Sequence, residues 1–227
     1  MVILVSSPEW FTGFDLLLEG FFIIVTFLIA FYSYKFYKLN GNIKYKYFGL
    51  AFLLMSLSFI GKGALNALSY FGLLDDPIIK VSRLLLDTSE SAQLLLVSGF
   101  VAHRFLMLLA FMGIFLVLYD LVDRKQVFLN VYFLAIIVLL SKYNYYVFHI
   151  TSALLLMFIV YYYYTMHAKK KKKGTLLVLF AFLTLFISQL LFLLLTFDTI
   201  YYVAAEIVQL IGFMALLANA YMIFWRK

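Results

Sequence analysis

Seven long apolar stretches, separated by short polar or basic breaks, limit what this chain can fold into. An α-helix needs about 20 apolar residues to cross the hydrocarbon core of a bilayer at 1.5 Å rise per residue. Six stretches meet this length and one, 126–141, is short. We therefore predict an all-α integral membrane protein, a seven-transmembrane-helix bundle. The predicted spans are 12–36, 47–72, 91–120, 126–141, 144–167, 175–197 and 200–225.

The composition excludes a water-soluble protein. Of the 227 residues, 66% are apolar and 13% are charged, whereas a soluble domain has about 25% charged residues. Long runs of leucine, isoleucine, phenylalanine and tyrosine with only two prolines also exclude a disordered chain. Because cysteine is absent, disulfides, thiolate metal sites and cysteine nucleophiles are excluded. We expect one polytopic membrane domain over 1–227, with no soluble domain.

Positive charges alternate between the breaks. Thirteen lysines and arginines follow the first, third, fifth and seventh stretches, and three lie in the other breaks. Cytoplasmic loops carry the excess of these residues in membrane proteins. The pattern predicts seven crossings, an outer N-terminus and a cytoplasmic C-terminus. The thirteen residues are Lys35, Lys38, Lys44, Lys46, Arg124, Lys125, Lys169 to Lys173, Arg226 and Lys227.

The same basic residues indicate where the protein is located and which partners it contacts. We expect a multi-pass protein of the cell membrane, in contact with the lipid bilayer. The run Lys169 to Lys173 is typical of a contact with anionic lipids at the inner surface. Another membrane protein is a further expected partner, because a sensor of this build would pass its signal laterally. No nucleic acid is expected as a partner.

Polar side chains inside the predicted spans all fall on the outer side of the helix midpoints. Ionisable groups within a bilayer are costly, and they generally face the bundle interior or a wet cavity. Counting 1.5 Å per residue from each midpoint places these groups in one layer, above inner halves that are almost entirely apolar. The predicted ligand-binding residues are Glu19, Lys62, Asn66, His103, Arg104, His149, Gln189, Glu206 and Gln209.

This layer favours a binding or sensor-type protein with a polar pocket in the outer half of the bundle. The expected ligand is a small polar or zwitterionic molecule, a divalent ion or a lipid headgroup. Glu19 and Glu206 suit a cationic group, whereas Arg104 and Lys62 suit an anionic one. The alternative is that two acids and two bases form interhelical ion pairs that only orient the helices.

Other functions use the same residues. A divalent metal could be held by His103, His149 and Glu206, since imidazole and carboxylate groups are common ligands. The two histidines could instead be the axial ligands of haem b in an oxidoreductase subunit. An accessory subunit of a membrane complex also fits the composition. Catalysis is not expected, because no serine within the spans stands in a nucleophile motif.

A secondary transporter or proton-coupled carrier is a further alternative. Ala51-Phe52-Leu53 and Ala181-Phe182-Leu183 occupy corresponding places after the first and fifth stretches. They hint at two parallel repeats of three helices joined by a single helix, a layout known in transporters.

Overall fold

The computed structural model describes residues 8–70, 90–121, 123–141 and 144–225, and all regular elements in these ranges are helical. The predicted span 47–72 extends past this part of the chain at positions 71 and 72. The helices are α1 (Thr12–Asn40), α2 (Ile43–Tyr70), α4 (Glu90–Leu118), α5 (Arg124–Ser141), α6 (Tyr145–Lys170), α7 (Lys173–Leu193) and α8 (Ile200–Trp225), with the 3₁₀ helices η1 (Glu9–Phe11) and η2 (Leu194–Thr196).

Six of these α-helices are long and apolar enough to cross a membrane, which supports a multi-pass membrane protein. The exception is α5, whose apolar part is Lys125–Ser141. At 1.5 Å per residue, α5 is about 27 Å long, slightly less than the roughly 30 Å of a hydrocarbon core. Its outer face is apolar and open, with Phe128, Phe133 and Leu139 all exposed. Such a face suits contact with lipid.

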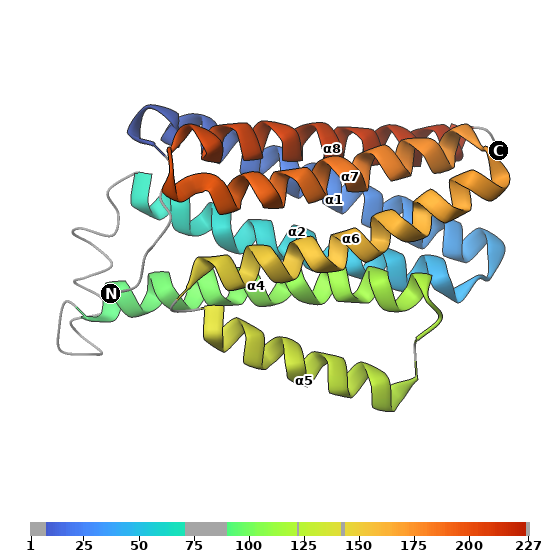
Figure 1. Ribbon diagram of the computed structural model, residues 1–227, viewed down its shortest axis with the longest axis horizontal. Coiled ribbons are helices and arrows are strands. Elements are labelled where there is room, and N and C mark those ends of the chain that lie inside the picture. The colour runs from blue at the N-terminus through green and yellow to red at the C-terminus, as the bar shows by residue number, and fades with distance from the viewer. Residues whose placement is uncertain (1–7, 71–89, 122, 142–143, 226–227) are drawn as a thin grey trace.

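The six long helices form a closed ring. Each packs against the next in the order α1, α2, α4, α6, α7 and α8, and α8 returns to α1. The remaining helix, α5, lies outside the ring against α4 and α6, as the lower helix in Figure 1. Among the described residues, six helices therefore build the ring, and α5 packs on its outside with Leu134 and Val138 buried.

Basic residues gather at one end of this bundle, which we call the lysine end. The ends of α1, α4 and α6 and the following helix starts lie there, at the right of Figure 1. Lys44 at the start of α2 pairs with Asp120 after α4 at 2.6 Å. The opposite end is called the polar end. The described residues that define the lysine end are Lys35, Lys38, Lys44, Lys46, Lys125 and Lys169 to Lys173.

Two groups of three helices follow one another around the ring. We call α1, α2 and α4 the first unit, and α6, α7 and α8 the second unit. Within each unit consecutive helices pack on one another, and the last helix of each unit packs on the first helix of the other. Three pairs of residues 130 positions apart in the sequence have similar features in the two units. These are the left-handed helix ends Gly41 and Lys171, the buried Phe52 and Phe182, and Ser58 and Ser188, which contact His103 and Gln209.

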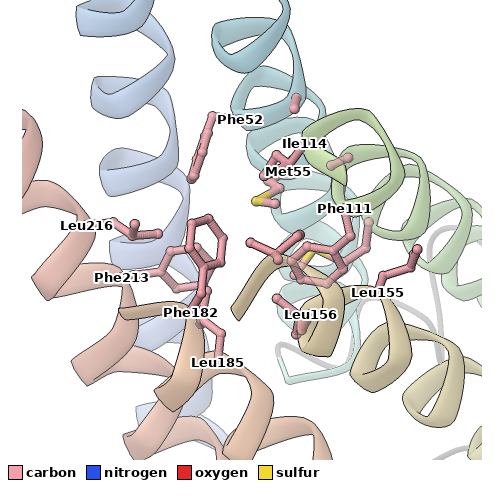
Figure 2. Close-up of a cluster of buried hydrophobic side chains, with 14 of the residues drawn as sticks. Phe52, Met55, Phe111, Ile114, Leu155, Leu156, Phe182, Leu185, Phe213 and Leu216 are labelled. Atoms are coloured by element: carbon pink, nitrogen blue, oxygen red, sulfur yellow. The ribbon is translucent and has the colours of Figure 1, made fainter. Parts of the chain in front are cut away.

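An apolar core fills the middle of the ring. Figure 2 shows large side chains of both units pointing toward one another, among them Phe52, Phe182 and Phe213, all three fully buried. The hydroxyl groups of Thr26 and Ser33 donate to carbonyl oxygens of their own helix, at 2.6 and 2.7 Å. Such internal bonds let hydroxyls lie in an apolar surrounding. This core separates the polar end from the lysine end.

Candidate functional site

A cavity of about 80 Å³ lies inside the ring, toward the polar end. Its walls come from both units, and seven of the nine predicted ligand-binding residues line it. Glu19 and Asn66 are not in its wall, but Glu19 pairs with the wall residue Lys62 and Asn66 donates to Glu19. The lining residues are Phe59, Lys62, Phe100, His103, Arg104, Met107, Phe148, His149, Gln189, Phe192, Tyr202, Glu206 and Gln209.

Lys62 links two glutamates from neighbouring helices of different units, Glu19 on α1 and Glu206 on α8. Its ammonium lies 3.1 Å from Glu19 Oε1 and 3.1 Å from Glu206 Oε1. Asn66, one turn further along α2, donates to the same oxygen of Glu19 at 2.6 Å. Gly63 leaves room for this approach, because a Cβ there would lie 3.3 Å from Glu19 Oε2. The first unit is thereby tied to the second at the polar end.

Asp15 and Tyr202 belong to the same cluster, although the sequence did not single them out as ligand-binding residues. The carboxyl group of Asp15 is 2% exposed, and both of its oxygens accept the Tyr202 hydroxyl, at 3.0 and 2.9 Å. Asp15 lies four residues before Glu19, and this spacing puts both acids on one face of α1. That spacing was the available signal. Tyrosine is too common in this chain, with 18 copies, for Tyr202 to stand out.

The two histidines are held by side chains of neighbouring helices. His103 Nδ1 lies 2.7 Å from Ser58 Oγ and 3.1 Å from the Ser58 carbonyl oxygen. His149 Nδ1 lies 2.9 Å from Gln189 Oε1. Carbonyl and amide oxygens accept hydrogen bonds, so a proton on Nδ1 satisfies both contacts and leaves each Nε2 as an acceptor.

Arg104 extends from α4 toward the outer helix. One guanidinium N–H donates to the carbonyl oxygen of Ser141, the last residue of α5. The guanidinium also lies 5.9 Å from the centre of the Phe148 ring. In the described part of the chain, it forms no ion pair with a carboxylate. Arg104 is therefore a cation in the cavity wall whose charge no acid of the described residues matches.

The described residues do not include a metal-ligand cluster. No three histidine, aspartate or glutamate side chains among them approach closely enough to hold a metal ion. His149, His103 and Glu206 share the cavity wall, but each already contacts another side chain. We therefore place no metal at these three residues.

The cavity does not fit a haem. The Phe148 ring contacts both imidazole rings, with centroids 6.2 Å from His103 and 4.9 Å from His149. A volume of about 80 Å³ is also well below the roughly 300–1,000 Å³ of pockets that hold larger organic ligands. The geometry suits a much smaller molecule.

Comparisons with known proteins give no match, whether made against protein-family models, curated proteins or solved structures. The reasoning on function therefore rests on the site itself.

Proposed function

We propose that the chain is a membrane-embedded binding protein whose cavity takes a small ligand with an anionic group. Arg104 carries this proposal. Its guanidinium is always charged, it lines the cavity, and no carboxylate among the described residues pairs with it. A charge removed from water is costly unless it is paired. A bound anion would supply the missing partner.

The cavity sets the size of this ligand. Its volume of about 80 Å³ equals that of a few waters at roughly 30 Å³ each. Acetate, glycine and similar molecules of few heavy atoms fit this size. Glu206 Oε2 has no hydrogen-bond partner and could accept from an ammonium group. The aromatic rings of Phe148 and Phe192 supply the apolar wall. The ligand class is therefore a small carboxylate or zwitterion.

Substitution of Arg104 tests the ligand site. Calorimetric titration of the purified protein with acetate, glycine and phosphate should show binding of at least one probe. The substitution Arg104→Gln should weaken that binding at least about tenfold, since it removes a charge-assisted hydrogen bond. Arg104→Lys, which retains a cation, should lose less.

Lys125→Gln is the matched control, because Lys125 is an exposed cation at the lysine end. It should leave the affinity unchanged. Thermal unfolding of each variant without ligand measures the stability lost with the Arg104 contact to Ser141. This separates a loss of stability from a loss of binding. If none of the three probes binds, or if Arg104→Gln binds as wild type does, the ligand proposal fails.

We propose that all seven helices cross the cell membrane with the lysine end in the cytoplasm and the N-terminus outside. The alternation of basic residues supports this orientation. Lys169 to Lys173 are exposed at the lysine end, where they would meet anionic lipids. The polar cavity would then lie in the outer half of the bundle.

Single cysteines test this orientation without interference, because the natural chain has none. Asn42, Lys172 and Asp198 are exposed between helices. In intact cells, an impermeant maleimide should label the variant Asp198→Cys but not Asn42→Cys or Lys172→Cys. The latter two should react only after the membrane is permeabilised. If Asn42→Cys and Lys172→Cys were labelled from opposite sides of the membrane, the proposal of seven crossings would be contradicted.

A carrier is the second candidate function, and the two units of three helices favour it. The cavity lies between them, with walls from α2 and α4 on one side and α6, α7 and α8 on the other. Parallel repeats that rock against each other around a central site are a known transporter design. Uptake of a bound probe into proteoliposomes would establish the carrier, whereas binding without uptake would favour a sensor.

A further inference from the structure

The buried polar cluster contains more acids than bases. Asp15, Glu19 and Glu206 are 2%, 0% and 1% exposed, and among the described residues Lys62 is the one cation that forms ion pairs within this cluster. For these four residues the formal charge is −2 when all are ionised. An uncompensated charge inside an apolar bundle is costly. A bound proton on one of the acids would reduce this charge.

The hydrogen bonds distinguish among the three carboxyl groups. Both oxygens of Asp15 accept the Tyr202 hydroxyl. Glu206 is part of the cavity wall, although its Oε2 is also buried without a hydrogen-bond partner. Glu19 does not line the cavity, and its Oε2 is buried without a hydrogen-bond partner. The Oε2 atom of Glu19 is the one for which ionisation is least compensated.

The two oxygens of Glu19 have the pattern of a neutral carboxylic acid. Oε1 accepts a hydrogen bond from Asn66 at 2.6 Å and lies 3.1 Å from the Lys62 ammonium, as the carbonyl oxygen of the acid would. Oε2 receives no donor, as expected for an oxygen that itself carries the hydrogen. The neighbouring backbone of α2 at Gly63 closes one side of Oε2.

We propose that Glu19 is a proton-binding site, with the proton on Oε2 at neutral pH. The charged and titratable groups that face it are Lys62 from α2, Glu206 and Tyr202 from α8, and Asp15 on its own helix. Lys62 opposes the proton, whereas the two acids favour it. Glu206 is then the ionised partner of Lys62. Because Lys62 also lines the cavity, the proton site and the ligand site share one cation.

Infrared difference spectroscopy of the ligand-free protein in nanodiscs tests this site independently of the proposed function. At pH 7, Glu19→Gln should remove a carbonyl-stretch band of a protonated carboxyl group, and Glu206→Gln should leave that band in place. Glu19→Gln should also keep the wild-type Tm, because an amide replaces a neutral acid of the same shape. Glu206→Gln should lower the Tm, because it removes the ionised partner of Lys62.

Four results would overturn the proposal. The first is a protonated-carboxyl band that persists in Glu19→Gln, and the second is a loss of carboxylate absorption alone. The third is a failure of Glu19→Gln to fold, since the neutral amide should be tolerated. Replacing Na⁺ with choline should leave the wild-type spectrum unchanged. A sodium-dependent spectrum would assign the compensating charge to a metal cation instead.

Discussion

Replacing Lys62 with methionine should lower the free energy of unfolding by about 3 kcal/mol or more, the cost of removing one partner from a buried ion pair. Methionine retains much of the length of the lysine side chain but none of its charge. The ammonium lies 3.1 Å from both Glu19 and Glu206. Without it, acids within the ring lose their nearest cation. Unfolding curves of the purified protein in mixed micelles would measure the change.

Lys44→Met is the matched control. Lys44 lies closer to its partner, 2.6 Å from Asp120, but these side chains are 48% and 70% exposed. Exposed ion pairs contribute at most about 1 kcal/mol, so Lys44→Met should have little effect. A second substitution, Glu206→Gln, should recover part of the stability lost in Lys62→Met, because it removes an uncompensated acid. Equal effects of Lys62→Met and Lys44→Met would show that burial does not strengthen the Lys62 contacts.

Replacing Phe182 with alanine should cost about 3–5 kcal/mol of unfolding free energy, the range for a buried phenylalanine. The side chain is fully buried, and it stacks on Tyr163 with ring centroids 5.5 Å apart. In a membrane protein, packing contacts are a main source of helix association. Lipid cannot refill a space enclosed by the ring, so these contacts are lost. The same unfolding curves would measure the change.

Phe180 provides the comparison within the same helix. It lies two residues before Phe182 and is 47% exposed. Lipid tails can replace its contacts after truncation, so Phe180→Ala should change stability little. Phe52, the counterpart of Phe182 in the first unit, is also fully buried, and Phe52→Ala should resemble Phe182→Ala. If Phe180→Ala and Phe182→Ala were equally costly, the assignment of inner and outer faces on α7 would be wrong.

The helices and the height of the polar residues could be predicted from the sequence because both depend on distance along the chain. Apolar length indicates a helix able to cross a membrane, and 1.5 Å per residue converts a position into a height. This reasoning placed Lys62 and Glu206 in one layer, and the structure joins them. It left Asp15 outside the proposed ligand-binding residues, because height alone does not show which way a side chain faces.

Neighbour relations could not be predicted in the same way. The ring order and the outer position of α5 depend on how side chains interlock, and every helix here is similarly apolar. The contact of Arg104 with the Ser141 carbonyl oxygen depends on α5 ending beside α4, which no spacing in the sequence indicates. The aromatic wall of the cavity was missed because aromatic residues form 20% of the chain.

The outer helix α5 determines the direction in which the helices of the second unit run. It contributes no side chain to the cavity, yet it joins the two units. Consecutive helices of the bundle run in opposite directions. If α6 followed α4 directly, it would run opposite to α1, and the two three-helix units would be antiparallel. The additional helix α5 makes α6 run in the same direction as α1, so the two units are parallel. His149 and Gln189 thereby reach the same level as Lys62, and one cavity can be lined by residues from both units.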